Sequence, residues 1–114
     1  MVEYTLQLDM IFSSLADPTR RDILQHVSRR EFSVGELVKK YDVSFAAISK
    51  HLKVLEKANL ITKRKEGKKQ MVTLAPSALR SADEYLEQYR RMWQSRHDKL
   101  EALLNEEGEY HERD

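Results

Sequence analysis

Two closely spaced helix-start signals constrain how the middle of this chain can fold. Ser33 is followed three residues later by Glu36, which is the capping-box pattern of a helix N-terminus. A second capping serine, Ser44, follows after a short polar turn. The segment between these two signals has room for one short helix only. The sequence therefore predicts two helices joined by a tight turn, the second starting at Ser44.

The second helix, expected over residues 44–58, has two chemically different faces. Ile48, Leu52 and Leu55 recur at helical spacing and form an apolar stripe. Small and basic side chains fall on the opposite side of the helical wheel, namely Ala46, Ser49, Lys50, Lys53 and Lys57. We expect this helix to pack through its apolar stripe and to present the small, cationic face to solvent.

The flanking segments predict a mainly α chain with a small β-hairpin. Upstream, one helix ends near Ala16 and the next starts at the capping pair Asp17-Pro18. Downstream, residues 60–74 contain two short strands around a basic turn. From Pro76, apolar residues recur at helical spacing, which predicts a long last helix over about residues 76–105. We expect one domain over residues 1–107, followed by an acidic tail at residues 108–114.

Composition narrows the class of protein. The chain has 114 residues and no cysteine, so disulfides, zinc–thiolate sites and thiol catalysis are excluded. Neither a Ser, His and carboxylate set nor a glycine-rich phosphate loop is present, so we expect no enzyme and no cofactor. The first residues lack the pattern of a secretory signal, and no apolar run has the length of a membrane span. We therefore expect a cytoplasmic protein with no membrane partner.

The net charge of +1 conceals a strong separation of charge along the chain. Residues 44–70 contain eight lysines or arginines against two acidic residues, whereas residues 101–114 contain six acidic residues against one arginine. A basic segment of this kind is the electrostatic signature of a polyanion-binding surface.

This order of elements meets the physical requirements of a winged helix-turn-helix. The major groove of DNA admits one α-helix, whose outward residues near its N-terminus reach the base edges. We expect five side chains of the second helix to face DNA: Phe45, Ala46, Ser49, Lys50 and Lys53. The hairpin is expected to hold the sugar–phosphate backbone through Lys63, Arg64, Lys65, Lys68 and Lys69.

The segment LADPTRRDIL, followed by SVGELVKKYDVSFAAISKHLKVLEKANLITKRKEGKKQMVTLAP, resembles the ArsR/SmtB family of repressors. The resemblance covers about residues 15–76 and implies a homodimer that represses transcription from an inverted-repeat operator in double-stranded DNA. It also implies dimerisation through the first and last helices. The apolar residues there that we expect at the interface are Leu8, Phe12, Leu86, Tyr89, Trp93 and Leu100.

The chain departs from the metal-sensing members of that family and is more similar to the branch without metal. The thiolate pair expected around residues 33–37 is absent, and the last helix has carboxylates at Asp83, Glu84 and Asp98 but only one central histidine, His97. Zinc usually takes four ligands. We therefore expect no metal site, while a site that pairs His97 with a second chain stays open.

Two other partners are compatible with a winged helix. The module could dock a protein, but the row Lys50, Lys53 and Lys57 favours DNA because protein interfaces are depleted in lysine. RNA readers usually present aromatic stacking platforms, and Phe45 is the one aromatic side chain on this face. The operator, the regulated genes and any small-molecule or protein effector stay open at this point.

Overall fold

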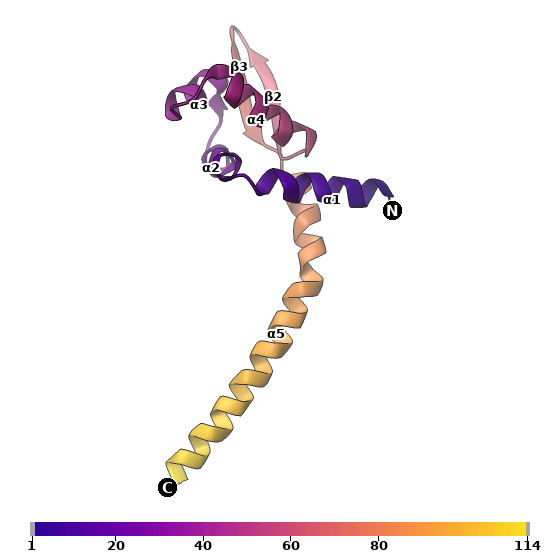
Figure 1. Ribbon diagram of the computed structural model, residues 1–114, viewed down its shortest axis with the longest axis vertical. Coiled ribbons are helices and arrows are strands. Elements are labelled where there is room, and N and C mark those ends of the chain that lie inside the picture. Colours follow the sequence, from indigo (N-terminus) through magenta and orange to yellow (C-terminus); the bar gives the residue numbers. More distant parts are fainter. Residues whose placement is uncertain (1, 114) are drawn as a thin grey trace. The chain divides into compact units, whose positions relative to one another are not determined.

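The computed structural model describes the backbone of residues 2–113 and the side chains of residues 5–106. Figure 1 shows the elements of this part. In chain order they are α1 (Val2–Leu15), α2 (Pro18–Val27), β1 (Phe32–Ser33), α3 (Val34–Lys40), α4 (Phe45–Lys57), β2 (Ile61–Glu66), β3 (Lys69–Leu74) and α5 (Pro76–Arg113). The chain forms two compact units. The first extends to Ala82 and contains α1 to α4, β1 to β3 and the start of α5, and the second is the rest of α5 from Asp83.

The helix caps that the sequence predicts are all present. The Asp17 carboxylate accepts a hydrogen bond from the backbone N–H of Arg20 at 2.9 Å. The Ser33 hydroxyl accepts from the N–H of Glu36 at 3.1 Å, and the Glu36 carboxylate accepts from the N–H of Ser33 at 3.0 Å. Ser44 caps α4 through the N–H of Ala47 at 3.1 Å. These bonds satisfy donors that a helix N-terminus otherwise leaves unpaired.

The end of α4 is equally well defined. Asn59 has φ of +60°, and its N–H donates to the carbonyl of Glu56 at 3.0 Å. The N–H of Leu60 donates to the carbonyl of Leu55 at 3.0 Å. This pair of bonds is the Schellman motif, which stops the helix and redirects the chain into β2.

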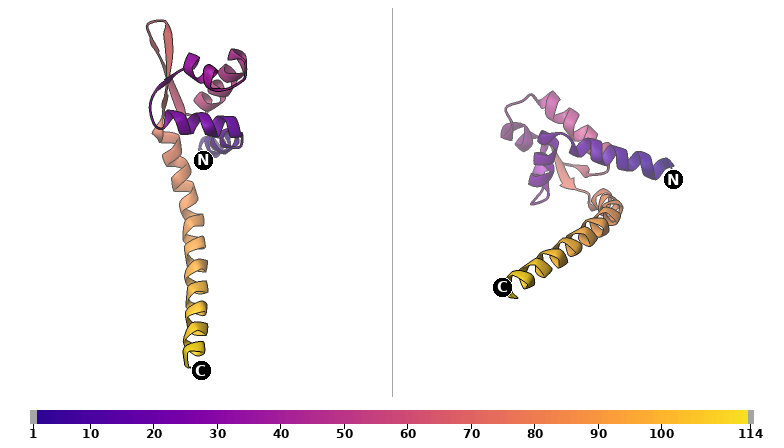
Figure 2. Two further views of the ribbon diagram at one scale, coloured as in Figure 1. Left: turned by 90° about the vertical axis from the view of Figure 1, so that its left-hand side faces the viewer. Right: turned by 60° about the horizontal axis from the view of Figure 1, so that its bottom comes forward.

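The sheet contains the predicted hairpin and one further strand. Its order is β1-β3-β2, and all pairs are antiparallel. Gly67, with φ of +63°, makes the tight turn between β2 and β3, and the hairpin stands away from the helices in Figure 2. Strand β1 is not predicted from the sequence, because two residues are too few to show strand alternation. Phe32 and Ser33 become a strand by pairing with Val72 and Met71.

One continuous core holds the first unit together. Its fully buried large side chains come from the helices α1 to α4 and from the hairpin and the residue before it: Ile11, Ile23, Leu37, Ile48, Leu52, Leu55, Leu60, Ile61 and Val72. The first turns of α5 close this core through Ala78 and Ala82, which are both buried. The core thus gathers α1 to α4 on the hairpin base and leaves the hairpin tip in solvent.

The last helix is longer than the sequence predicts. It continues to Arg113 rather than ending near residue 105, so most of the expected acidic tail is helical backbone, and residue 114 lies outside the described residues. Pro76 opens the helix and no second proline follows it, so nothing in the sequence enforces an earlier stop. None of the described helices, α5 included, combines the length and the apolar character that a membrane crossing needs.

Removing a core contact of α4 tests this packing. Leu52 is 1% exposed, so Leu52→Ala should lower the free energy of unfolding by about 2–5 kcal/mol through lost burial and a cavity. Urea denaturation at one fixed protein concentration measures the change. Lys53→Ala at the adjacent exposed position is the matched control and should stay within about 0.5 kcal/mol. Equal effects of the two substitutions would contradict the orientation of α4.

Candidate nucleic-acid interface

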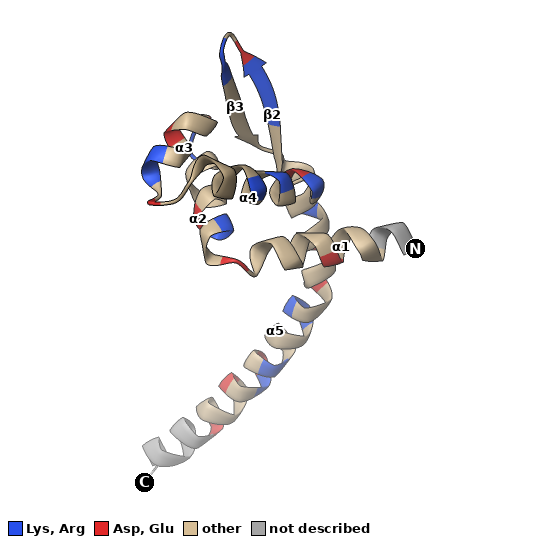
Figure 3. Ribbon diagram, turned by 45° about the horizontal axis from the view of Figure 1, so that its top comes forward, with Lys and Arg blue, Asp and Glu red and all other residues tan. Residues whose placement is uncertain are grey.

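The α4 helix presents its polar face outward. Ile48, Leu52 and Leu55 are buried, as the sequence predicts. On the other side, Phe45 is 62% exposed and Ser49 is half-buried. The other outward residues are exposed, namely Ala46, Lys50, Lys53 and Lys57. Figure 3 shows blue segments along α4, where its lysines lie.

A polar cluster fixes α4 against the junction of α1 and α2. The Arg20 guanidinium donates from Nε to the carbonyl of Ser14 at 2.9 Å, and its Nη1 lies 3.3 Å from Nδ1 of His51 on α4. Nδ1 of His51 also lies 3.9 Å from the Asp17 carboxylate. The backbone N–H of Arg20, more than any charge nearby, holds the pKa of Asp17 below its usual range. His51 is thus a helix-positioning residue at the edge of the core.

A second contact sets α3 against α2. The Tyr41 hydroxyl, just after α3, donates to the Asp22 carboxylate at 2.5 Å. Partial burial, reinforced by this carboxylate, raises the pKa of Tyr41 far above its usual value, so the donor stays protonated. His26 packs edge-on to the Tyr41 ring with centroids 6.4 Å apart. Sequence periodicity cannot reveal this bond, because the partner carboxylate belongs to another helix.

The five hairpin cations do not play one common role. Lys63 is expected to hold DNA, but its side chain is 14% exposed and its Nζ lies 3.4 Å from the Glu56 carboxylate of α4. Arg64 bonds to both carboxylate oxygens of Glu31 and also to Glu66 at 2.9 Å. Both residues are therefore engaged within the chain, which changes the expectation that they are free to grip phosphates.

Three hairpin lysines stay available for a ligand. Lys65, Lys68 and Lys69 are exposed. Within residues 5–106, no carboxylate lies within 4 Å of their amines, nor of those of Lys50 and Lys53. Unpaired lysines thus lie on the hairpin turn and on the outer face of α4, and Figure 3 shows blue segments at both places.

The predicted interface residues of α1 differ in exposure. Leu8 is 7% exposed and belongs to the chain's own core, so little of its surface is left for a partner. Phe12 is half-buried. Among the described side chains of α1, the large apolar ones that are exposed are Leu6 at 56% and Met10 at 39%. Helical spacing alone gives a stripe without saying which neighbour covers it, so the place of Leu8 in the dimer interface stays a prediction.

The second unit carries a long apolar stripe. Leu86, Tyr89, Trp93 and Leu100 are all predicted interface residues, and their exposed fractions range from 42% to 62%. Leu103 continues the stripe and is 59% exposed. These residues are three, four or seven positions apart, which places them on one face of the helix.

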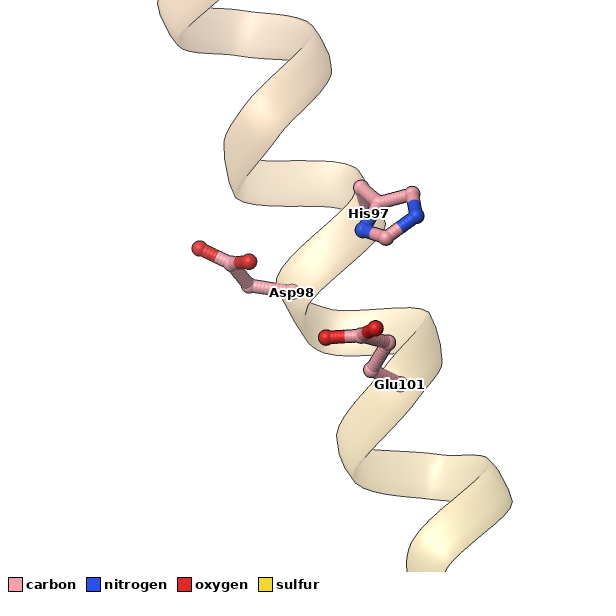
Figure 4. Close-up of side chains that lie close together, drawn as sticks. All are labelled: His97, Asp98 and Glu101. Carbon is pink, nitrogen blue, oxygen red and sulfur yellow. The ribbon is translucent and has the colours of Figure 1, made fainter.

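Three possible metal ligands lie together on the same helix. His97, Asp98 and Glu101 have ligand atoms within 4.8 Å of one another (Figure 4). The His97 ring also stacks on Trp93 with centroids 5.0 Å apart, and Asp98 accepts a hydrogen bond from Gln94 at 3.0 Å. His97 and Asp98 are candidate ligands in the sequence already, whereas Glu101, four residues after His97, is added by the structure. Three exposed ligands are fewer than the four that zinc usually takes.

Comparison with known proteins identifies the architecture. A family model for a helix-turn-helix domain matches residues 15–64, which contain α2 to α4 and the start of the hairpin. The transcriptional repressor SdpR of Bacillus subtilis is 30% identical over 60 residues, which are 53% of this chain and 67% of that protein.

Two longer matches cover nearly the whole fold. The HTH-type transcriptional regulator Rv2034 of Mycobacterium tuberculosis is 34% identical over 101 residues, covering 89% of this chain and 92% of that protein. The crystal structure of an ArsR family transcriptional regulator is 32% identical with a TM-score of 0.73, covering 80% of this chain and 94% of that chain. This chain therefore belongs to the ArsR/SmtB family of winged helix-turn-helix transcriptional regulators.

Proposed function

We propose that the protein is a homodimeric repressor that binds an inverted-repeat operator in double-stranded DNA. The observation that carries the proposal is the outer face of α4, where Lys50 and Lys53 are exposed without a carboxylate partner among the described residues. Phosphate neutralisation by free lysines supplies much of the affinity of proteins for DNA. The relatives named as transcriptional regulators and as a repressor support the same assignment.

We assign the recognition of the DNA base sequence to the first turns of α4. Phe45 can contact a thymine methyl group, Ala46 permits close approach, and Ser49 can donate or accept a hydrogen bond. Lys50 can reach the acceptors on a guanine edge, and Lys53, one turn later, fits a phosphate. Lys65, Lys68 and Lys69 are assigned to the backbone beside the groove, whereas Lys63 and Arg64 mainly keep the hairpin in shape.

We assign the contact with a second protomer to the exposed apolar stripe of α5. Side chains such as Trp93, 62% exposed, and Leu100, 56% exposed, lose contact with water when a second copy covers them. A dimer also matches a two-fold operator, because each protomer reads one half-site. Acting on DNA in the cytoplasm, such a protein works by binding rather than by catalysis.

Replacing Lys50 separates base reading from simple charge attraction. Lys50→Ala should weaken operator binding by about 1–3 kcal/mol, roughly 5- to 150-fold, and should relax the preference at one position of each half-site. The operator is first selected from a random library, and fluorescence anisotropy then measures affinity for single-base variants.

Lys57→Ala is the matched control because Lys57 lies on the same helix, is exposed, and is far from the N-terminal turns. This variant should keep the full preference among operator variants. If Lys50→Ala weakens every sequence by the same factor, Lys50 contacts only phosphate and the base-reading role is wrong.

Replacing Trp93 tests the dimer interface. Trp93→Ala should raise the dimer dissociation constant by about 30-fold or more, because a buried aromatic at an interface centre contributes about 2 kcal/mol or more. Sedimentation velocity over a range of concentrations measures this constant. Arg91→Ala, at a side chain that is 79% exposed on the polar face, should leave it unchanged. A wild-type protein that remains a folded monomer at micromolar concentration would refute the interface.

A further inference from the structure

A cationic cleft lies beside the reading helix. Its volume is about 470 Å³, and it is formed by α3, the first residue of α4 and the start of β3. Lys39 lines it from α3, Lys68 and Lys69 line it from the hairpin, and Phe45 lines it from α4. Figure 3 shows the blue segments of α3 and of the hairpin turn from which these lysines come. Neither the basic segment of the sequence nor the helical wheel of α4 includes Lys39.

The charge in this cleft is predominantly positive. No carboxylate of residues 5–106 lies within 4 Å of the amines of Lys39, Lys68 or Lys69. The acidic residue of the lining, Glu36, is already engaged: its carboxylate accepts from the N–H of Ser33 at 3.0 Å and from Arg30 at 3.0 Å. The Ser33 N–H, followed by the Arg30 guanidinium, lowers the pKa of Glu36. The Ser33 N–H and the Arg30 guanidinium thus compensate the charge of the Glu36 carboxylate.

The two walls of the cleft are joined by the sheet. Ser33 pairs with Met71 of β3 and at the same time caps α3. Phe32, the other residue of β1, pairs with Val72 and is buried. The short strand that leads into α3 is therefore hydrogen-bonded to the strand that follows the hairpin turn. This connection joins the backbone segments that carry Lys39 and Lys69 before any ligand binds, which reduces the ordering cost of binding.

We propose that this cleft holds the phosphates of one DNA strand, with Lys39 gripping the backbone from α3 and Lys68 and Lys69 gripping it from the hairpin. The inference rests on the proposed function and adds Lys39 to it as a phosphate-binding residue. The exposed Phe45 ring supplies an apolar wall for a sugar or a base methyl group next to the phosphates. Fixing the strand in the cleft sets the depth and direction at which the first turn of α4 meets the bases.

The test uses two adjacent lysines of one helix. Lys39→Gln removes a cleft charge, whereas Lys40→Gln removes a charge that is outside the cleft lining and 5.9 Å from the centre of the Phe32 ring. Fluorescence anisotropy on the selected operator between 50 and 200 mM salt gives the slope of log affinity against log salt. Lys39→Gln should reduce the magnitude of this slope by about one per protomer, with the same affinity loss on every operator variant. Lys40→Gln should leave the slope unchanged.

A modified DNA identifies the contact itself. Methylphosphonate replaces the phosphates of a half-site one at a time and removes a single charge at each. The phosphate whose replacement weakens the wild-type protein but has no further effect on Lys39→Gln is the one that Lys39 holds. Equal slopes for wild type, Lys39→Gln and Lys40→Gln would overturn the cleft assignment while DNA binding stands. Absence of wild-type binding at 50 mM salt would overturn the proposed function itself.

Discussion

Burial of a single apolar stripe fixes the orientation of α4, and the outward position of its polar face depends on this orientation. Ile48, Leu52 and Leu55 are each no more than 1% exposed, so the helix cannot rotate about its axis without exposing them. Burying side chains of this size contributes about 1.5–3 kcal/mol each. The opposite face is therefore held in solvent, with Ala46, Lys50 and Lys53 outward. The caps at Ser44 and Asn59 then fix where this face starts and ends.

The cations of the hairpin fall into two groups, those paired within the chain and those without a carboxylate partner among the described residues. Successive side chains of a strand point to opposite faces, so Lys63 lies toward α4 and meets Glu56, while Arg64 points the other way and meets Glu31 and Glu66. The pairs with Glu56 and Glu31 tie the hairpin to the body of the unit. The lysines nearer the turn lie beyond such partners and keep their charge for a ligand. Counting cations in the sequence alone thus overstates the charge available for DNA.

Local signals in the sequence predict most of the fold. Asp17, Ser33 and Ser44 cap helices as expected because a cap depends on residues within one turn of it. Features that depend on distant neighbours are missed. Strand β1 is defined by its pairing with Val72 and Met71 of β3, and the Lys63 amine lies 3.4 Å from the Glu56 carboxylate of α4. The place of Lys39 beside Lys68 likewise follows from the sheet, which brings together residues far apart in the chain.

The central claim is that the outer face of α4 reads the major groove in two half-sites of a dimer. Dimethyl sulfate interference on the selected operator tests it directly, because methylation of guanine N7 blocks the major groove and methylation of adenine N3 blocks the minor groove. The account predicts interference by N7 methylation in two clusters about 10 base pairs, or a multiple of one helical turn, apart. Interference confined to adenine N3, or a single unpaired N7 cluster, would contradict it.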